Sequence, residues 1–342
     1  MTTHLNILYL GMLSGTCLDR ANAYRRLGHK VTHIDPRTLL PASSWVDHVT
    51  WHLGDHWLSP LMTHQLKHVL QGRHFDLCHV DSGEWINRAG VRVLKECATK
   101  VINYNIDDPT GSRDVRRFTC YRSAVASYDL VVVVREENVS EVKALGATNV
   151  LRVYRSADEV THAPRSLTAE DEEKWASDVL FLGTWMPERG PFLLRLIELG
   201  VPLTIRGARW EKAPEWDKLQ VHWKGGHIDG DDYAKAIQCA KVNLGLLSKG
   251  NRDLHTTRSL EIPALGSLLC AERTAEHSHL FKENEEILMW SSPEECAHQC
   301  LYALNNGTNR AMIANNGHHR FQVNQLGNQH ICNLLINNTI GR

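Results

Sequence analysis

Apolar residues in the first half of the chain occur in short runs, separated by longer stretches with helical periodicity. Buried strands are expected at residues 5–10, 31–34, 75–80, 101–105 and 130–134. The run LVVVV after Asp129 contains no polar position, which is typical of a strand covered on both faces. Strands that alternate with helices indicate βαβ units and a parallel sheet.

A second series of the same kind follows in the second half. Strands are expected there at residues 179–183, 202–206, 219–223, 242–246, 268–271 and 287–290. The polar stretch 156–178 contains Pro164 and an acidic run, and it is predicted to be a linker followed by a solvated helix. The segment 311–335 has a helical pattern. Two consecutive Rossmann-like halves are the simplest arrangement of these elements.

Length and charge narrow the class of protein. A chain of 342 residues favours two domains over one ordinary core. Its net charge of −1 argues against the clustered basic face that general nucleic-acid binding requires. No apolar run reaches the ~18 residues that a membrane-spanning helix needs. The histidines show no zinc-binding spacing, and no metal site is expected.

The nine cysteines are scattered and form no CxxC pair. An odd, dispersed set without a signal peptide indicates free thiols in a reducing cytoplasm. Cys296 and Cys300 lie four positions apart on a predicted helix. Simple packing in the core is the favoured interpretation of this pair, with a metal or redox role as the alternative.

A first candidate phosphate element runs from Gly183 to Pro191, after a predicted strand and at the start of a predicted helix. Gly183 lets the backbone approach a ligand closely, because it has no side chain. Arg189 lies at the entrance of the helix, where it can meet a diphosphate. The alternative is that Arg189 is a surface arginine beside a proline-rich turn.

The second candidate element is TTRSLEIPALG at residues 256–266. Thr257 and Arg258 stand at a helix start, where backbone N–H groups and a guanidinium bind phosphate. Glu261, one turn later, can accept hydrogen bonds from ribose hydroxyls. The alternative is a buried helix in which Arg258 and Glu261 form an ion pair. Pro263 makes this helix short and broken, which favours a role for its N-terminal end.

The N-terminal half has its own candidate ligand loop, at the end of the first strand. Gly11, Ser14, Gly15 and Thr16 lie where open α/β sheets place their ligands. The spacing of the glycines differs from GxGxxG, and no dinucleotide fingerprint follows. NAD binding is therefore not expected.

An acidic pair, Asp107 and Asp108, follows another predicted strand and precedes Pro109. One of the two carboxylates can act as a general base on an acceptor hydroxyl. The alternative is a turn-forming Asp-Pro sequence with a capping role.

Taken in order, these motifs resemble the CgeB-like (spore-maturation-protein-like) glycosyltransferases of the GT-B fold. The matching pieces are ILYLG at 7–11, RRLGHKV at 25–31, NIDDP at 105–109, YDL at 128–130, GATNV at 146–150, DVLFLG at 178–183, AKVNL at 240–244, RSLEIPALG at 258–266, LF at 280–281 before EI at 286–287, and RAMIA at 310–314. They cover nearly the whole chain, and RSLEIPALG is the most specific of them.

The resemblance implies an α/β fold with two Rossmann-like domains that face each other across a cleft. Residues 1–160 would form the acceptor domain and residues 161–320 the nucleotide-sugar donor domain. A C-terminal helix within 321–342 would pack back on the first domain. The implied enzyme is a hexosyl- or pentosyltransferase that is metal-independent, needs no cofactor and retains the anomeric configuration.

The resemblance also implies roles for the loop before Arg258. Retaining GT-B enzymes carry two acidic residues eight positions apart, the second of which binds ribose. If Glu261 is the second, Asp253 is the first and faces the donor sugar. His255 either hydrogen-bonds the diphosphate or sugar, or is a solvated loop histidine.

The acceptor is left open by the sequence, as a glycan, a small molecule, a protein or a modified nucleic-acid base. Two other functions share most of these features. A nucleotide-sugar epimerase of the same fold would use the same diphosphate site. A non-catalytic binding or structural protein would keep the fold and bind no nucleotide.

Overall fold

Residues 4–41, 43, 54 and 56–341 are described by the computed structural model. They divide into two units. Unit 1 contains Met1–Tyr154, Gly250–Arg252 and Asn328–Arg342, and unit 2 contains Arg155–Lys249 and Asp253–Gly327. The chain passes from the first unit to the second after Tyr154, whereas the sequence placed a domain boundary after residue 160.

Unit 1 alternates strands and helices as the sequence predicts. Its strands are β1 (Asn6–Leu10), β2 (Lys30–Ile34), β3 (Phe75–Asp81), β4 (Ala98–Asn105), β5 (Leu130–Val133) and β6 (Val150–Arg152). Its α-helices are α1 (Gly15–Arg26), α3 (Ser59–Leu70), α4 (Arg88–Cys97), α5 (Thr119–Ala124), α6 (Glu136–Ala144) and α15 (Asn328–Ile336). The strands form one parallel sheet in the order β2-β1-β3-β4-β5-β6.

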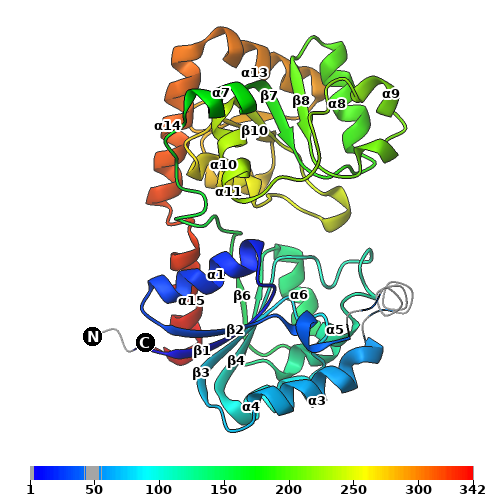
Figure 1. Ribbon diagram of the computed structural model, residues 1–342, viewed down its shortest axis with the longest axis vertical. Coiled ribbons are helices and arrows are strands. Elements are labelled where there is room, and N and C mark those ends of the chain that lie inside the picture. Colours follow the sequence, from blue (N-terminus) through cyan, green and yellow to red (C-terminus); the bar gives the residue numbers. More distant parts are fainter. Residues whose placement is uncertain (1–3, 42, 44–53, 55, 342) are drawn as a thin grey trace. The chain divides into compact units, whose positions relative to one another are not determined.

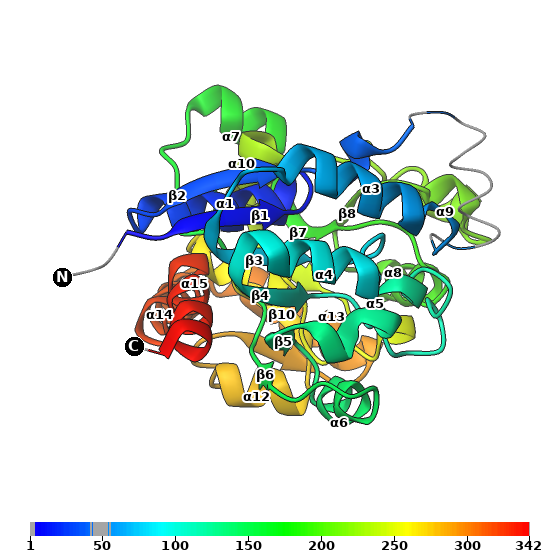
Figure 2. The same cartoon turned by 90° about the horizontal axis from the view of Figure 1, so that it is seen from below.

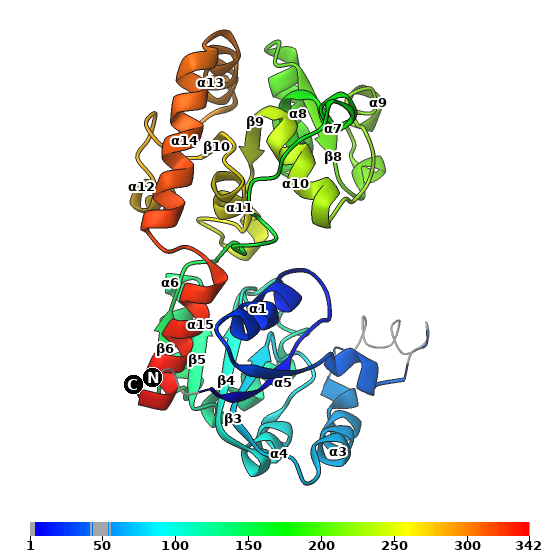
Figure 3. The same cartoon turned by 60° about the vertical axis from the view of Figure 1, so that its left-hand side comes forward.

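Helices cover both faces of this sheet because successive strand residues point to opposite faces. Leu8 and Leu10 of β1 pack in one cluster with residues of α3, α4 and α5. Ile7 and Tyr9 pack in the other, with residues of α1 and α15. Figures 1 and 3 show α15 beside α1, and Figure 2 shows α3 and α4 lying together. The C-terminal helix α15 therefore completes the core of unit 1.

Unit 2 has the same alternation. Its strands are β7 (Ser177–Leu182), β8 (Leu203–Arg206), β9 (Ala240–Gly245), β10 (Leu269–Glu272) and β11 (Leu288–Trp290). Its α-helices are α7 (Ala169–Trp175), α8 (Arg189–Glu198), α9 (Trp216–Leu219), α10 (Gly230–Cys239), α11 (Arg258–Ala264), α12 (Ala275–Leu280), α13 (Pro293–Asn305) and α14 (Gly307–Val323).

The second sheet is also parallel, in the order β11-β10-β9-β7-β8. Its main core lies against α8 and α13, while Leu180 and Leu182 face α7 and α10. In chain order both sheets begin 2-1-3-4-5, so each has one point where the direction of strand addition reverses. That point lies between β1 and β3 in unit 1 and between β7 and β9 in unit 2, and such reversals are where open α/β sheets bind ligands.

Two short segments differ from the sequence prediction. The predicted strand at 219–223 is wrong, because Leu219 ends α9 and only Trp223 pairs with β8, through a single bridge to Ile205. Val221, which would share a strand face with Leu219, is 67% exposed. The edge strand β6 was not predicted, since it is only three residues long and half-buried.

No helix in the described part of the chain is long and apolar enough to cross a membrane.

Candidate functional site

Arg189 lies at the strand reversal of the second sheet, as the first residue of α8. Its Nη1 donates to the backbone carbonyl of Thr184 at 2.7 Å. Its Nη2 lies 3.4 and 3.3 Å from the carbonyl oxygens of Leu246 and Leu247, which directly follow β9. The loop after β7 and the end of β9 thus position one guanidinium between them.

The charge of Arg189 is buried, and no salt bridge to a carboxylate is found for it among the described residues. The residue is only 6% exposed, and its Nε has no hydrogen-bond partner in the described part of the chain. Burial, followed by the positive charge of Arg258, lowers the pKa of Arg189 to about 10, against weaker opposing effects of Glu188 and Asp253. The positive charges of Arg189 and Arg258 repel each other in a buried environment. An anion that binds between them would stabilise both.

Arg258 supplies the second cation, as the first residue of α11. Its Nε is also buried without a hydrogen-bond partner among the described residues. Thr257 precedes it in a helical conformation, with no capping hydrogen bond from its side chain. The helix ends at Ala264, and Gly266, with φ of +72°, closes the turn by donating its N–H to the carbonyl of Pro263 at 3.0 Å.

Gly183 gives the loop its close packing. A Cβ atom at this position would lie 2.8 Å from the ring of Phe181 and 3.5 Å from Nη1 of Arg189. The N–H of Gly183 donates a hydrogen bond to the backbone carbonyl of Arg206 at 2.9 Å. A side chain at residue 183 would therefore displace the strand end that carries the arginine.

A cavity of about 190 Å³ lies beside Arg189. Its lining includes Phe192 and Trp290 together with the charged residues Glu188, Lys249 and Glu272. Ligand pockets for whole small molecules have volumes of roughly 300–1,000 Å³. This cavity alone thus has room for only part of a nucleotide sugar.

Glu261 is enclosed by other protein groups. It is 6% exposed, and its Oε2 accepts a 2.5 Å hydrogen bond from the hydroxyl of Tyr233. Its Oε1 lies 3.6 Å from Nε2 of His162, whose Nδ1 accepts the N–H of Asp158 at 2.9 Å. The alternative ion pair between Glu261 and Arg258 is not seen in the described part of the chain.

Asp253 and His255 are both held by protein groups. Oδ1 of Asp253 accepts a hydrogen bond from Nη2 of Arg155 at 3.1 Å. Nε2 of His255 accepts the backbone N–H of Arg155 at 2.9 Å, while its Nδ1 pairs with Glu276. Both ring nitrogens of His255 are thereby hydrogen-bonded within the protein. This geometry disagrees with the solvated-loop alternative and indicates that the ring holds the loop in place.

The predicted N-terminal loop leads from β1 into α1. Gly11 has no room for a side chain, since a Cβ atom would lie 2.9 Å from the ring of Tyr9 and 3.0 Å from Cβ of Asp81. Gly15 has φ of +56° and open space around it. Ser14 precedes the helix without a capping hydrogen bond from its side chain, and the carbonyl of Thr16 accepts Nη1 of Arg20 at 3.1 Å. These residues form the strand reversal of unit 1.

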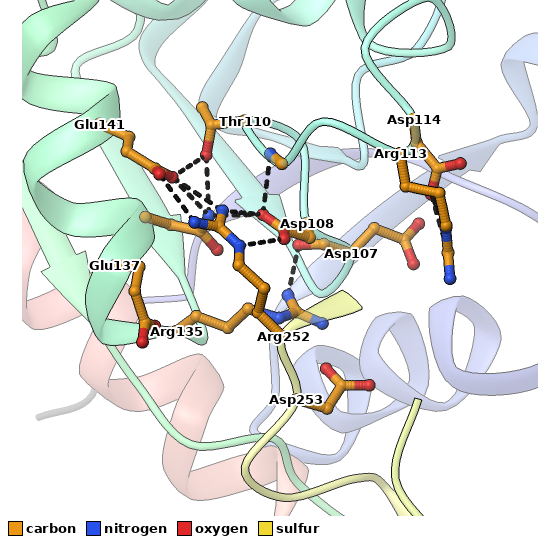
Figure 4. A network of polar contacts seen from close by, with 12 residues as sticks. Asp107, Asp108, Thr110, Arg113, Asp114, Arg135, Glu137, Glu141, Arg252 and Asp253 are labelled. Atoms are coloured by element: carbon orange, nitrogen blue, oxygen red, sulfur yellow. Dashed lines mark hydrogen bonds and ion pairs between the residues drawn. The ribbon is translucent and has the colours of Figure 1, made fainter. Parts of the chain in front are cut away.

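The acidic pair splits into two different environments. Asp107 is partly exposed and pairs with Arg117 at 3.0 Å. Asp108 is buried and is held by Arg252, with Nε donating to Oδ2 at 2.7 Å and Nη2 to Oδ1 at 2.6 Å (Figure 4). Burial raises the pKa of Asp108, but hydrogen bonds from Arg252 and Asn138 outweigh it and leave the pKa below its usual value.

A general base needs a free carboxylate with a pKa near the working pH. Asp108 has neither property, and its Oδ1 also accepts the N–H of Gly111 at 3.1 Å, as a turn-forming aspartate does. The geometry therefore favours the structural alternative for Asp108 over a catalytic role.

Glu141 on α6 is the second carboxylate that Arg252 contacts. The hydrogen bonds of Arg252, aided by Thr110 and Asn138 and opposed by partial burial, lower the pKa of Glu141 to about 2. A carboxylate whose pKa is lowered on folding stabilises the folded state above its unfolded pKa, and this contribution disappears as the pH falls through its folded pKa.

We therefore expect Glu141→Gln to unfold at a lower urea concentration than the wild type at pH 7. The difference should shrink as the pH falls from about 4.5 to about 2. Free energies of unfolding measured between pH 2 and pH 7 test this, with Glu137→Gln as the control, because Glu137 is an exposed carboxylate on the same helix. A difference that does not change with pH would contradict it.

Three cysteines meet in the core of unit 2. Cys270 of β10 lies with Cys296 and Cys300 of α13, and their sulfur atoms are within 4.8 Å of one another. All three are completely buried among apolar residues. This is the only such group of metal-ligand type found among the described residues. None of the three is a predicted site residue.

Sequence reasoning missed the residues that hold the predicted side chains in place. Tyr233, His162, Arg155, Glu276 and Arg252 each contact a predicted site residue. They lie on other elements of the fold, at no fixed spacing from their partners. Only the packing of the sheets reveals them.

A family comparison matches the part of the chain that contains several of these residues. Residues 189–336, which begin at Arg189 and include Arg258 and Glu261, match the family model described as glycosyl transferase-like. A comparison with curated protein sequences gives no match.

The structure is similar to those of GT-B glycosyltransferases. HepE of Anabaena, in complex with UDP-glucose, aligns with a TM-score of 0.63 and 13% identity over 98% of this chain and 99% of that chain. Sucrose-phosphate synthase from Thermosynechococcus elongatus aligns with a TM-score of 0.65 and 12% identity, over 96% and 97%. A glycosyltransferase from Rickettsia africae gives 0.61 and 14%, over 99% and 100%.

The predicted α/β fold of the GT-B class is thus confirmed, while the CgeB-like subfamily remains a resemblance of the sequence. Residues 189–336 are glycosyltransferase-like, in agreement with the predicted enzyme class.

Proposed function

We propose that this protein transfers a sugar from a nucleoside diphosphate sugar to an acceptor hydroxyl. The observation that supports this most is the pair Arg189 and Arg258, two cations at one strand reversal, each with a buried Nε that lacks a hydrogen-bond partner among the described residues. A diphosphate supplies both the negative charge and the acceptor oxygens that these groups lack.

The same pair accounts for the chemical step. Negative charge builds up on the diphosphate as the bond to the sugar breaks. Fixed guanidinium groups that already point to this place stabilise that charge without having to reorganise. Glu261 contributes on the nucleoside side, because a carboxylate that accepts one hydroxyl from Tyr233 still has lone pairs for ribose hydroxyls.

UDP is the first nucleotide to test, because the structure of HepE is a complex with UDP-glucose. Thermal unfolding should be compared with UDP, GDP, dTDP, ADP and CMP. A ligand at a hundredfold excess over its Kd stabilises the folded state by about 2.7 kcal/mol. Stabilisation by one nucleoside diphosphate, and none by its nucleoside, is the expected result. No shift with any nucleotide would oppose the proposal.

Sugar transfer should continue in the presence of EDTA. Arg189 and Arg258 supply the positive charge at the diphosphate, which other glycosyltransferases obtain from a divalent ion. The measurement is release of nucleoside diphosphate from the donor, with and without chelator. Loss of activity with EDTA, restored by manganese or magnesium, would show that the arginines are insufficient.

A further inference from the structure

Gly250–Arg252 is a segment of unit 1 although the residues on both sides of it belong to unit 2. Arg252 is the residue that attaches it. Besides its two hydrogen bonds to Asp108, Arg252 donates from Nη1 and Nη2 to the two oxygens of Glu141, at 2.8 and 2.9 Å. Each carboxylate is bound in the two-pronged way that gives arginine pairs their geometric specificity.

The two carboxylates are themselves held in place, as Figure 4 shows. Nδ2 of Asn138 donates to Asp108 at 2.8 Å and to Thr110 at 2.8 Å. Thr110 in turn donates to Glu141 at 2.5 Å. The clamp, by which we mean Arg252 with Asp108 and Glu141, is therefore a supported network, unlike a pair of mobile surface side chains.

The residue after the clamp is fixed in a different way. Asp253 accepts its hydrogen bond from Arg155, the first residue of unit 2. His255 is fastened by the backbone of Arg155 and by Glu276. Arg252 is thus held by Asp108 and Glu141, and the residues from Asp253 onward, which lead to Arg258 and Glu261, are held by Arg155 and Glu276.

We propose that Arg252 is a positioning residue for sugar transfer, which holds the segment before α11 by its clamp on Asp108 and Glu141. This inference rests on the proposed function. Because Arg252 directly precedes Asp253 in the chain, fixing the side chain of Arg252 restricts the backbone of the segment before α11. Arg252 itself touches neither the diphosphate arginines nor Glu261 in the described structure.

The role predicts a particular pattern of kinetic effects. A misplacement of about 1 Å can reduce turnover by roughly a hundredfold. Arg252→Gln should therefore lower turnover by about ten- to a hundredfold, while the Kd for UDP changes less than about twofold. Arg252→Lys keeps the charge but loses the two-pronged geometry. Its turnover should therefore lie between that of the wild type and that of Arg252→Gln.

The experiment measures UDP binding by calorimetry and UDP release from UDP-glucose for the wild type, Arg252→Gln, Arg252→Lys and Glu141→Gln. Arg88→Gln is the control, since Arg88 is an exposed arginine at the start of α4. Hydrogen–deuterium exchange of residues 249–257 reports the clamp independently of activity. Faster exchange in Arg252→Gln and Glu141→Gln, with unchanged exchange in Arg88→Gln, is expected.

A double variant separates positioning from general-base catalysis by Asp108. If the clamp acts as a unit, Arg252→Gln with Asp108→Asn should lose no more turnover than the worse single variant. If the losses of turnover in the two single variants instead multiply in the double variant, Asp108 has a chemical role of its own. That result would overturn the inference that Asp108 serves to hold Arg252.

Other outcomes would also overturn the inference. These are wild-type turnover in Arg252→Gln, equal losses of UDP binding and turnover, or unchanged exchange in residues 249–257. Failure of the wild type to bind any nucleoside diphosphate would instead refute the proposed function, and with it the role of Arg252 in transfer, even where exchange still shows the clamp.

Discussion

Replacing Arg189 or Arg258 with alanine is expected to weaken the binding of a nucleoside diphosphate far more than that of the nucleoside. Only the diphosphate presents negative charge to the two guanidinium groups. A lost hydrogen bond to a charged group costs about 1.5–3 kcal/mol, which corresponds to roughly ten- to hundredfold in affinity. The nucleoside, which lacks phosphate, should bind both variants as it binds the wild type.

The double variant carries further information about the site. Residues that share one ligand group are usually non-additive, by roughly 0.5–3 kcal/mol. Calorimetric titration of UDP and uridine into the wild type, both single variants and the double variant measures this coupling. Arg195→Ala is the matched control, because Arg195 lies on α8 as Arg189 does, but is exposed and paired with Glu294.

Two results would contradict a shared diphosphate site. Equal losses for UDP and uridine would place an arginine away from the phosphates. Strict additivity in the double variant would separate the two arginines. Unfolding of Arg189→Ala is not expected from its charge, since burial makes the charged side chain costly in the free protein.

Glu261→Ala is expected to reduce UDP affinity by roughly ten- to hundredfold, because a carboxylate that accepts ribose hydroxyls is lost. Inorganic pyrophosphate has no ribose and should bind the variant as it binds the wild type. Competition calorimetry with UDP and pyrophosphate separates the two effects. Equal losses for both ligands would move Glu261 from the ribose to the phosphates, and unchanged UDP binding would remove it from the site.

The surroundings of Glu261 call for a second variant. Alanine leaves the hydroxyl of the half-buried Tyr233 without its acceptor, and loss of the acceptor of a buried donor destabilises a fold by about 1–3 kcal/mol. Tyr233→Phe removes the same hydrogen bond but keeps the carboxylate. We expect it to lower the melting temperature while UDP binding persists, which distinguishes damage to the fold from loss of a ligand contact.

The sequence predicted elements whose pattern is local. An apolar run such as that of β5 can be placed from its own residues, because burial on both faces requires a continuous run. Arg189 and Arg258 were found because each lies at a strand or helix boundary with a recognisable motif. The strand at 219–223 was wrongly predicted because only its local pattern was used. The same alternation of residues also occurs where a short helix is followed by a single β-bridge.

Contacts between distant residues could not be predicted in this way. Arg252 and Asp108 are 144 positions apart, and Arg155 and Asp253 are 98 apart. No spacing rule relates such pairs, because the order of the strands in the sheet decides which loops meet. For the same reason the sequence could not decide between the general-base and turn-forming alternatives for Asp108, nor identify Tyr233 as the partner of Glu261.

The sequence by itself determined the two series of alternating strands and helices, and the cationic residues at their boundaries. Hydrophobic periodicity fixes which residues must be buried, and the ends of parallel strands fix where polar groups gather. Only the tertiary structure decided which of those polar groups stay available for a ligand. Among the described residues, the Nε atoms of Arg189 and Arg258 have no hydrogen-bond partner, whereas Asp108 and His255 are paired with other groups. Pairing depends on which side chains the packed sheets bring within hydrogen-bond distance.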